Sequence, residues 1–108
     1  MRITINVLEK WAKENPDKLI SYLSDPLAEN WVLTFAAEIA GNSLASDVVV
    51  EPLLNLLNHA SPLVREGTIY GLYNHINVKG VIEKIKELSE KDTSAGVRNA
   101  ALELLSGI

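Results

Sequence analysis

The chain has 108 residues, of which 47% are apolar and 22% charged, with a formal net charge of −4 and no cysteine. This length and composition are typical of one globular domain and exclude an intrinsically disordered chain. The lack of cysteine excludes a disulfide framework, a thiolate zinc site and a cysteine nucleophile. The acidic balance also disfavours nucleic acid as a partner, because nucleic-acid-binding proteins gather Lys and Arg on one face to contact phosphates.

The apolar runs are too short for a signal peptide or a membrane span. We therefore expect a soluble, cytoplasmic chain that does not enter a membrane. Lysine is locally enriched between residues 79 and 91, but glutamates are interleaved with these lysines. That pattern predicts a solvated helix face rather than a track for phosphates.

In chain order, residues 4–14 are predicted to form an N-terminal helix with Ile5, Leu8 and Trp11 on one side. Three pairs of helices follow, each a short helix and then a longer one. Their apolar residues recur at the i, i+3, i+4 and i+7 spacings of an amphipathic helix. The predicted pairs cover residues 17–24 and 26–40, 49–58 and 62–76, and 80–90 and 95–106.

Capping residues mark where the longer helices should begin. Asp25-Pro26 and Ser61-Pro62 each place a good N-cap residue before a proline at the first helical position. Thr93-Ser94 offers a third N-cap. A proline deep inside a helix is costly, so the helix that contains Pro52 should begin near residue 47 or 48.

The helix pairs repeat with a period of 33 residues. Trp31, Val64 and Val97 are each 33 positions apart, and the same register aligns Phe35 with Thr68 and Ala101, and Ile39 with Leu72 and Leu105. Within each helix these positions are four apart and share one face. The register therefore predicts a core stripe that includes Trp31, built from an internal repeat.

The residues at these positions resemble those of HEAT repeats. Residues 51–57 look like the first helix of such a repeat, and Ser61 to Arg65 look like its turn and the start of its second helix; residues 82–105 show the pattern again. The resemblance implies an all-α, right-handed α-solenoid of about three helical hairpins (HEAT-like) plus an N-terminal helix. Residues 1–108 would be a single HEAT-like repeat domain, with an N-terminal helix over 1–15, a degenerate repeat over 16–42, and repeats over 47–77 and 80–108.

In that family an Asp in the turn and an Arg six residues later form a ladder between neighbouring repeats. Asp92 and Arg98 match both positions, and Arg65 matches the Arg. His59 stands where the Asp would be, and Val32 replaces the Arg of the first copy. The resemblance thus implies a structural ladder of Arg65, Asp92 and Arg98, with a degenerate first copy that could act as a cap.

No motif for catalysis or for a cofactor is present. His59 and His75 belong to no metal-binding pair, and there is no phosphate loop, nucleophile elbow or zinc signature. His59 is expected in a turn, and His75 is expected to interact with a helix dipole. Gly67 and Gly71 are expected to let their helix approach its hairpin partner closely. We therefore predict no catalytic residue, no metal and no cofactor.

In HEAT-like solenoids the second helices of successive repeats line the concave surface. The 33-residue register would place there Leu33 with Glu66 and Asn99, Ala37 with Tyr70 and Glu103, and Ala40 with Tyr73 and Ser106. Tyrosine suits recognition, although either ring could instead be partly buried between repeats, which is the expected position of Tyr73. Trp11 is expected to seal the N-terminal end, with a partner anchor as the alternative. The candidate partner-binding residues are Glu66, Tyr70, Tyr73, Asn99 and Glu103.

These features predict a protein–protein interaction or scaffold module that binds a protein or peptide. A specialised version would be an acidic, antitoxin-like protein that masks a basic surface. The alternative is an enzyme or enzyme accessory resembling bilin lyases or helical-repeat DNA glycosylases, but these imply a long array or a basic, aromatic-lined groove. The apolar helix at the end of the sequence adds a further hypothesis, self-association through the terminal repeat faces.

Overall fold

The computed structural model describes residues 2–108 as a bundle of α-helices. Within these residues there is no β-strand, which confirms the predicted all-helical class. The elements are α1 (Ile5–Glu14), α2 (Pro16–Leu23), α3 (Asn30–Ser43), α4 (Ser46–Leu56), α5 (Pro62–Gly71), a short 3-10 helix (Tyr73–His75), α6 (Val81–Lys91) and α7 (Ala95–Ser106).

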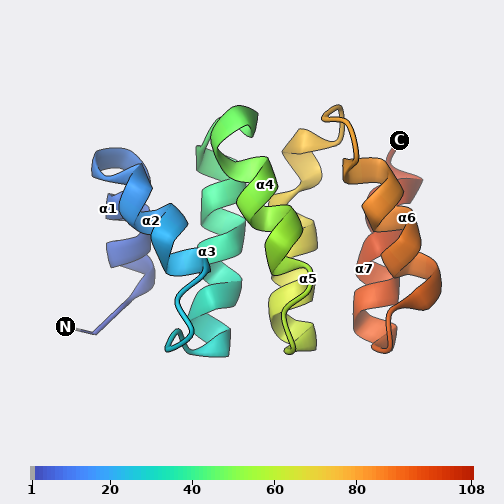
Figure 1. The fold of residues 1–108 in the computed structure, drawn as a ribbon, viewed down its shortest axis with the longest axis horizontal. Helices are drawn as coiled ribbons and strands as arrows, with labels where there is room; N and C mark the ends of the chain where they lie inside the picture. Colours follow the sequence, from blue (N-terminus) through green and yellow to red (C-terminus); the bar gives the residue numbers. More distant parts are fainter. Residues whose placement is uncertain (1) are drawn as a thin grey trace.

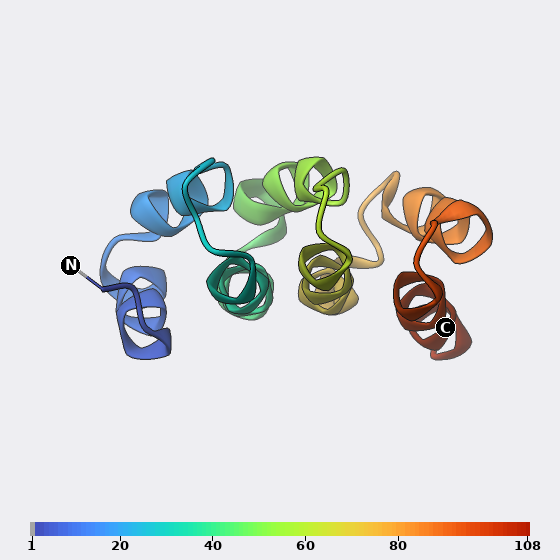
Figure 2. The same cartoon turned by 90° about the horizontal axis from the view of Figure 1, so that it is seen from below.

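The helices lie in two rows (Figures 1 and 2). One row holds α1, α3, α5 and α7, and the other holds α2, α4 and α6. The molecule measures 39 × 25 × 18 Å, and the most extensive contact between elements is that of α3 with α5. In Figure 2, α1 and α7 lie lower than α3 and α5, so the outer surface of the four-helix row is shallowly concave.

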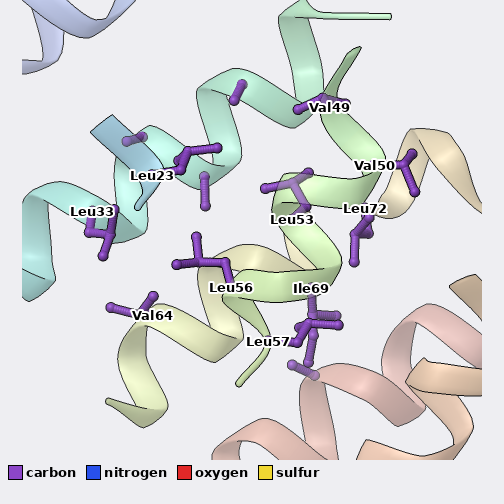
Figure 3. Packing of buried hydrophobic residues seen from close by; sticks show 14 of the residues in the cluster. Leu23, Leu33, Val49, Val50, Leu53, Leu56, Leu57, Val64, Ile69 and Leu72 are labelled. Atoms are coloured by element: carbon purple, nitrogen blue, oxygen red, sulfur yellow. The ribbon is translucent and has the colours of Figure 1, made fainter. Parts of the chain in front are cut away.

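The hydrophobic core fills the space between the two rows. Figure 3 shows side chains from α2, α3, α4 and α5 gathered there. Leu33, Leu53 and Ile69 are at most 1% exposed. Burying one such side chain contributes about 1.5–3 kcal/mol, so this core supplies the main force that holds the rows together.

Two glycines allow α5 to approach α3 closely. A Cβ atom on Gly67 would lie 2.6 Å from the Thr34 side chain, and one on Gly71 would lie 2.5 Å from the Ala37 carbonyl oxygen. The predicted role of these glycines in close packing is therefore confirmed, but the predicted neighbour was wrong. The glycines face α3 in the same row rather than α4, their hairpin partner.

Several helices begin close to their predicted starts. α5 begins at Pro62, as predicted, and α7 begins after Ser94, whose Oγ accepts a hydrogen bond from the Val97 N–H at 3.4 Å. α4 begins at Ser46, slightly before the start near residue 47 or 48 that Pro52 predicted. The end of α5 differs from its prediction. The helix stops at Gly71 and a 3-10 helix follows, where the sequence predicted continuation to residue 76.

The start of α3 is the main correction to the sequence interpretation. The helix begins at Asn30 rather than at Pro26, because the Asp25 carboxylate accepts a hydrogen bond from the Leu27 N–H at 2.9 Å and closes a separate turn. The buried positions of α3 therefore fall one or two residues later than the 33-residue register predicts. They are Val32, Leu33, Thr34, Ala36, Ala37, Ala40 and Gly41.

This shift turns two residues of the predicted core stripe outwards. Trp31 is 45% exposed and Phe35 is 38% exposed. The prediction that both residues belong to the core was therefore wrong. Val64, Thr68 and Val97, which the same register assigned to the core, are fully buried.

Candidate functional site

Four aromatic side chains are 38–45% exposed along α3, α5 and the 3-10 helix that follows α5. Trp31 and Phe35 on α3 meet edge to face, with ring centroids 6.4 Å apart, and the Trp31 Nε1–H donates to a Glu29 carboxylate oxygen at 2.7 Å. Tyr70 on α5 and Tyr73 at the start of the 3-10 helix lie with ring centroids 5.7 Å apart. Tyr73 is 38% exposed, so its ring is partly buried, as expected, and partly open to solvent.

Carboxylates from three helices surround Tyr70. Burial raises the pKa of the Tyr70 hydroxyl, and repulsion from the carboxylates of Glu103, Glu66 and Glu38 raises it further. These acids come from α7, α5 and α3, which are neighbours in the four-helix row. Burial also raises the pKa of Glu38 itself.

Tyr73 and α7 extend the same surface. Burial raises the pKa of Tyr73, with further contributions from Glu103 and Tyr70. Asn99 and Glu103 are exposed and lie one helical turn apart on α7. We call this surface the aromatic–acidic face, and its residues are Trp31, Phe35, Glu38, Glu66, Tyr70, Tyr73, Asn99 and Glu103.

All five candidate partner-binding residues from the sequence, Glu66, Tyr70, Tyr73, Asn99 and Glu103, belong to this face. Their predicted α3 neighbours do not, since Leu33, Ala37 and Ala40 are buried in the core. The sequence interpretation instead missed Trp31, Phe35 and Glu38. These three follow the i, i+4, i+7 spacing of one helix face, but only a helix that begins at Asn30 turns that face outwards.

Arg65 and Asp92 lie behind this surface, at the junction between the second and third hairpins. The Arg65 Nε and Nη2 groups donate to the two carboxylate oxygens of Asp92, at 3.0 and 2.9 Å. Arg65 Nη1 also donates to the carbonyl oxygens of His59 and Ala60. The guanidinium therefore joins its own turn to the turn of the next hairpin.

The pKa of Asp92 reflects these contacts. Burial acts to raise it, but the hydrogen bonds from Arg65 and from the Ser94 N–H, together with the charges of Arg65 and Arg98, outweigh burial and lower the pKa. Arg98 acts on the backbone of the same turn, because its Nη1 donates to the Asp92 carbonyl oxygen at 2.7 Å.

One hydrogen bond recurs in the turns of all three hairpins. The Asp25 carboxylate accepts from the Leu27 N–H, His59 Nδ1 accepts from the Ser61 N–H, and the Asp92 carboxylate accepts from the Ser94 N–H, each at 2.9 Å. The residue at the first position of each turn thus holds the backbone two residues later. His59 lies in a turn, as predicted, and Asp25 is the counterpart of Asp92 in the first hairpin.

His75 is buried, and its ring lies against the C-terminal end of α3, the negative end of that helix dipole. Its Nε2 lies 2.7 Å from the Gly41 carbonyl oxygen, and its Nδ1 lies 2.6 Å from the Ser46 hydroxyl. A carbonyl oxygen only accepts, so Nε2 carries a proton and donates to it. The imidazole therefore ties the 3-10 helix to the junction between α3 and α4, which is a structural role.

Trp11 packs within the N-terminal helices. It meets Tyr22 edge to face at 5.9 Å, and the Lys18 ammonium lies 5.2 Å from the centre of its ring. The side chain is partly buried against the core. These contacts agree with the predicted sealing role at this end.

An apolar groove of about 430 Å³ lies between the ends of α2 and α4 and the turns that follow them. Ile20, Leu23 and Leu56 contribute apolar side chains to its walls, and Asn55 and Asn58 contribute polar ones. Ser24 and His59 line it as well, and both bond the nearby backbone: the Ser24 hydroxyl donates to the Ser21 carbonyl oxygen at 3.2 Å, and His59 Nδ1 accepts from the Ser61 N–H at 2.9 Å.

Within residues 2–108, no group of three or more His, Asp or Glu side chains is placed to hold a metal ion. In the same part of the chain, no helix combines the length and the apolar character needed to cross a bilayer. No family model, no curated protein and no solved structure matches the chain.

Proposed function

We propose that this chain is a HEAT-like helical-repeat module that binds a protein or peptide through the aromatic–acidic face. One observation carries the proposal. Trp31, Phe35, Tyr70 and Tyr73 are each 38–45% exposed on adjacent helices, within a surface that also carries Glu38, Glu66 and Glu103. Large aromatic side chains gathered on a surface are a common feature of binding sites.

The recurrent turns support the repeat assignment. Asp25, His59 and Asp92 make the same hydrogen bond at spacings close to 33 residues. The Arg65–Asp92 pair joins consecutive hairpins in the manner that the HEAT resemblance implies. We therefore propose that the two rows of helices form a short right-handed solenoid, in which the four-helix row faces the partner.

The charge of the face indicates the chemistry of the partner. Glu38, Glu66 and Glu103 would repel phosphates and attract Lys or Arg side chains. An arginine or lysine seated on the ring of Trp31 or Tyr70 would gain a cation–π contact beside these carboxylates. The partner that fits best is a basic segment of a protein with apolar side chains between its cations.

Affinity capture from the native cell, read by quantitative mass spectrometry, tests this function. The test variant combines Tyr70→Ala and Glu103→Lys, which remove one ring and reverse one charge on the face. The matched control is Glu51→Lys, which makes the same charge change at an exposed position of α4 in the other row. Each truncated anchor residue at an interface costs about 1–2 kcal/mol, so recovery of the partner should fall about tenfold or more with the double variant.

The control variant should recover the partner as the wild-type chain does. All three proteins should melt at nearly the same temperature, because the substituted side chains are exposed. Equal capture by the wild-type and double-variant chains would show that the face is not the binding site. Capture of proteins without a basic segment would contradict the proposed partner chemistry.

A further inference from the structure

Each junction between successive hairpins carries a groove beside the hairpin turns, which lie at the same end of the molecule (Figure 1). The first groove, between the ends of α2 and α4, has a volume of about 430 Å³, and the second, between the ends of α4 and α6, has about 420 Å³. Their walls are built from matching residues, 33 or 34 positions apart, which include Asp25 and His59, Pro26 and Ala60, and His59 and Asp92. The two grooves are therefore equivalent sites in successive junctions.

An arginine side chain occupies the second groove. Arg65 enters it from α5 and donates to the carbonyl oxygens of His59 and Ala60 on one wall. The same guanidinium donates to the Asp92 carboxylate on the other wall. Because a guanidinium is planar and carries five N–H donors, it can bond acceptors on both walls at once. The second groove therefore holds both members of an ion pair.

The first groove has acceptors of the same kind, but no cation uses them. Asp25 lines it, and the Asp25 Oδ1 atom accepts the Leu27 N–H at 2.9 Å. Within residues 2–108, the other carboxylate oxygen of Asp25 has no hydrogen-bond donor and no ion-pair partner, although Arg2 lines a neighbouring cleft with it. In the same residues, nothing donates to the carbonyl oxygen of Pro26, the counterpart of Ala60. The first groove thus offers a negative charge and a carbonyl acceptor without a cation.

The apolar walls of the first groove suit the aliphatic part of an arginine side chain. Leu33 stands on the α3 wall, where α5 contributes Arg65 to the second groove. Leu23 and Leu56 line the same space, and the three leucines are 1–7% exposed. A long cationic side chain packs its methylene groups on such a surface and keeps its charged end against polar groups. Phosphates and carboxylates would instead be repelled by the Asp25 carboxylate.

We propose that the first groove binds an arginine side chain of a partner protein, with its guanidinium at the Asp25 carboxylate and its methylene groups on the three leucines. The partner thus supplies the arginine that this junction lacks and that the second junction has in Arg65. A lysine fits less well, because its ammonium group lacks the planar fork that bonds two acceptors at once. None of the residues that line this groove belongs to the aromatic–acidic face, so the proposal does not rest on the proposed function.

An NMR titration with two small probes tests this site. The probes are N-acetyl-arginine N-methylamide and the same compound with citrulline in place of arginine, which has nearly the same shape but no charge. The arginine probe should shift the backbone amide signals of Leu27 and Asn58 at the groove, with a dissociation constant of about 1–10 mM. The citrulline probe should bind at least about tenfold more weakly, because it cannot form an ion pair with Asp25.

Asp25→Asn separates binding from folding. The Asn side-chain oxygen can still accept the Leu27 N–H, so the melting temperature should stay the same. The negative charge is lost, so the arginine probe should bind at least about tenfold more weakly. Asp47→Asn is the matched control, because it makes the same change at an exposed position in the first turn of α4, and it should leave binding unchanged.

The titration also distinguishes this groove from the aromatic–acidic face. In the chain that carries Tyr70→Ala and Glu103→Lys, the arginine probe should shift the groove signals as it does in the wild-type chain. Shifts confined to the aromatic–acidic face would overturn the groove site and leave the proposed function standing. Equal binding of the two probes, or equal binding by the wild-type and Asp25→Asn chains, would also overturn it. So would the absence of a saturable shift at probe concentrations up to about 50 mM.

Discussion

Arg65 and Asp92 are 27 residues apart in the sequence and form a bidentate ion pair. The guanidinium of Arg65 donates to both carboxylate oxygens of Asp92, at 2.9 and 3.0 Å. Their side chains are only 11% and 5% exposed. Breaking a buried pair leaves the remaining charge without its partner, so Arg65→Ala should lower the free energy of unfolding by about 3 kcal/mol. Urea denaturation measures this.

Arg98→Ala is the matched comparison for that variant. Arg98 donates to one backbone carbonyl oxygen and holds no carboxylate in the described chain, so its loss should cost about 1 kcal/mol or less at low protein concentration. Equal losses for Arg65→Ala and Arg98→Ala would contradict the assignment of the Arg65–Asp92 pair as the stronger link.

Because of the same pair, the free energy of unfolding should depend on pH in the acid range. The pKa of Asp92 in the folded chain lies below its ordinary value of 3.8, so the ionised carboxylate stabilises the folded state at any pH above that value. This contribution is lost as the pH falls below about 4 and through the folded pKa. Asp92→Asn should therefore be less stable than the wild-type chain at neutral pH, and the difference should shrink at low pH. A difference that stays constant between neutral pH and strong acid would contradict the lowered pKa.

Gly71→Ala should strongly destabilise the chain. The added methyl group would lie 2.5 Å from the backbone oxygen of Ala37, and neither helix can move away without separating α3 from α5. Overpacking of this kind costs about 1–3 kcal/mol. Gly96→Ala is the control, because the nearest atoms there belong to the end of the flexible Glu66 side chain. Thermal unfolding should show a large loss for Gly71→Ala and little change for Gly96→Ala.

Truncation should destabilise the chain much more at Val64 than at Trp31, although the two residues occupy matching positions in the 33-residue register. Val64 is fully buried, so Val64→Ala should cost about 2 kcal/mol. Trp31 is 45% exposed, so Trp31→Ala should cost much less despite the larger volume removed. Denaturant unfolding of the two variants measures this, and a larger loss for Trp31→Ala would contradict the outward position of Trp31.

The contrast between these two residues shows what the sequence can and cannot predict. The helical class, the period and the start of α5 and α7 follow from apolar spacing and from Ser61-Pro62 and Ser94, which act locally. The start of α3 was predicted wrongly because Asp25-Pro26 also suits a cap, and only the fold shows Asp25 closing a turn before the helix. Each residue of an α-helix advances by about 100° around the helix axis, so an error of one or two residues in the register assigns side chains to the wrong face. For this reason Trp31 and Phe35 were predicted in the core but lie at the surface.

Contacts between residues far apart in the sequence are the second feature that could not be predicted from the sequence. The resemblance in the sequence implied that Arg65, Asp92 and Arg98 form one ladder. It did not show that Arg65 donates to the Asp92 carboxylate, whereas Arg98 donates to the Asp92 carbonyl oxygen. The gathering of Glu38, Glu66 and Glu103 around Tyr70 likewise depends on the packing of three helices. The α7 and α5 members of that group were predicted because their helices keep the register, and Glu38 was missed because α3 does not.

Photo-crosslinking in the native cell is the most direct measurement of the proposed binding face. A benzophenone-bearing phenylalanine analogue replaces Tyr70 in one protein and Glu51, on the opposite row, in another. We predict a crosslinked partner from position 70, joined through a basic segment of that partner, and little or none from position 51. Equal crosslinking from both positions, or crosslinking from position 51 alone, would contradict a binding face on α3, α5 and α7.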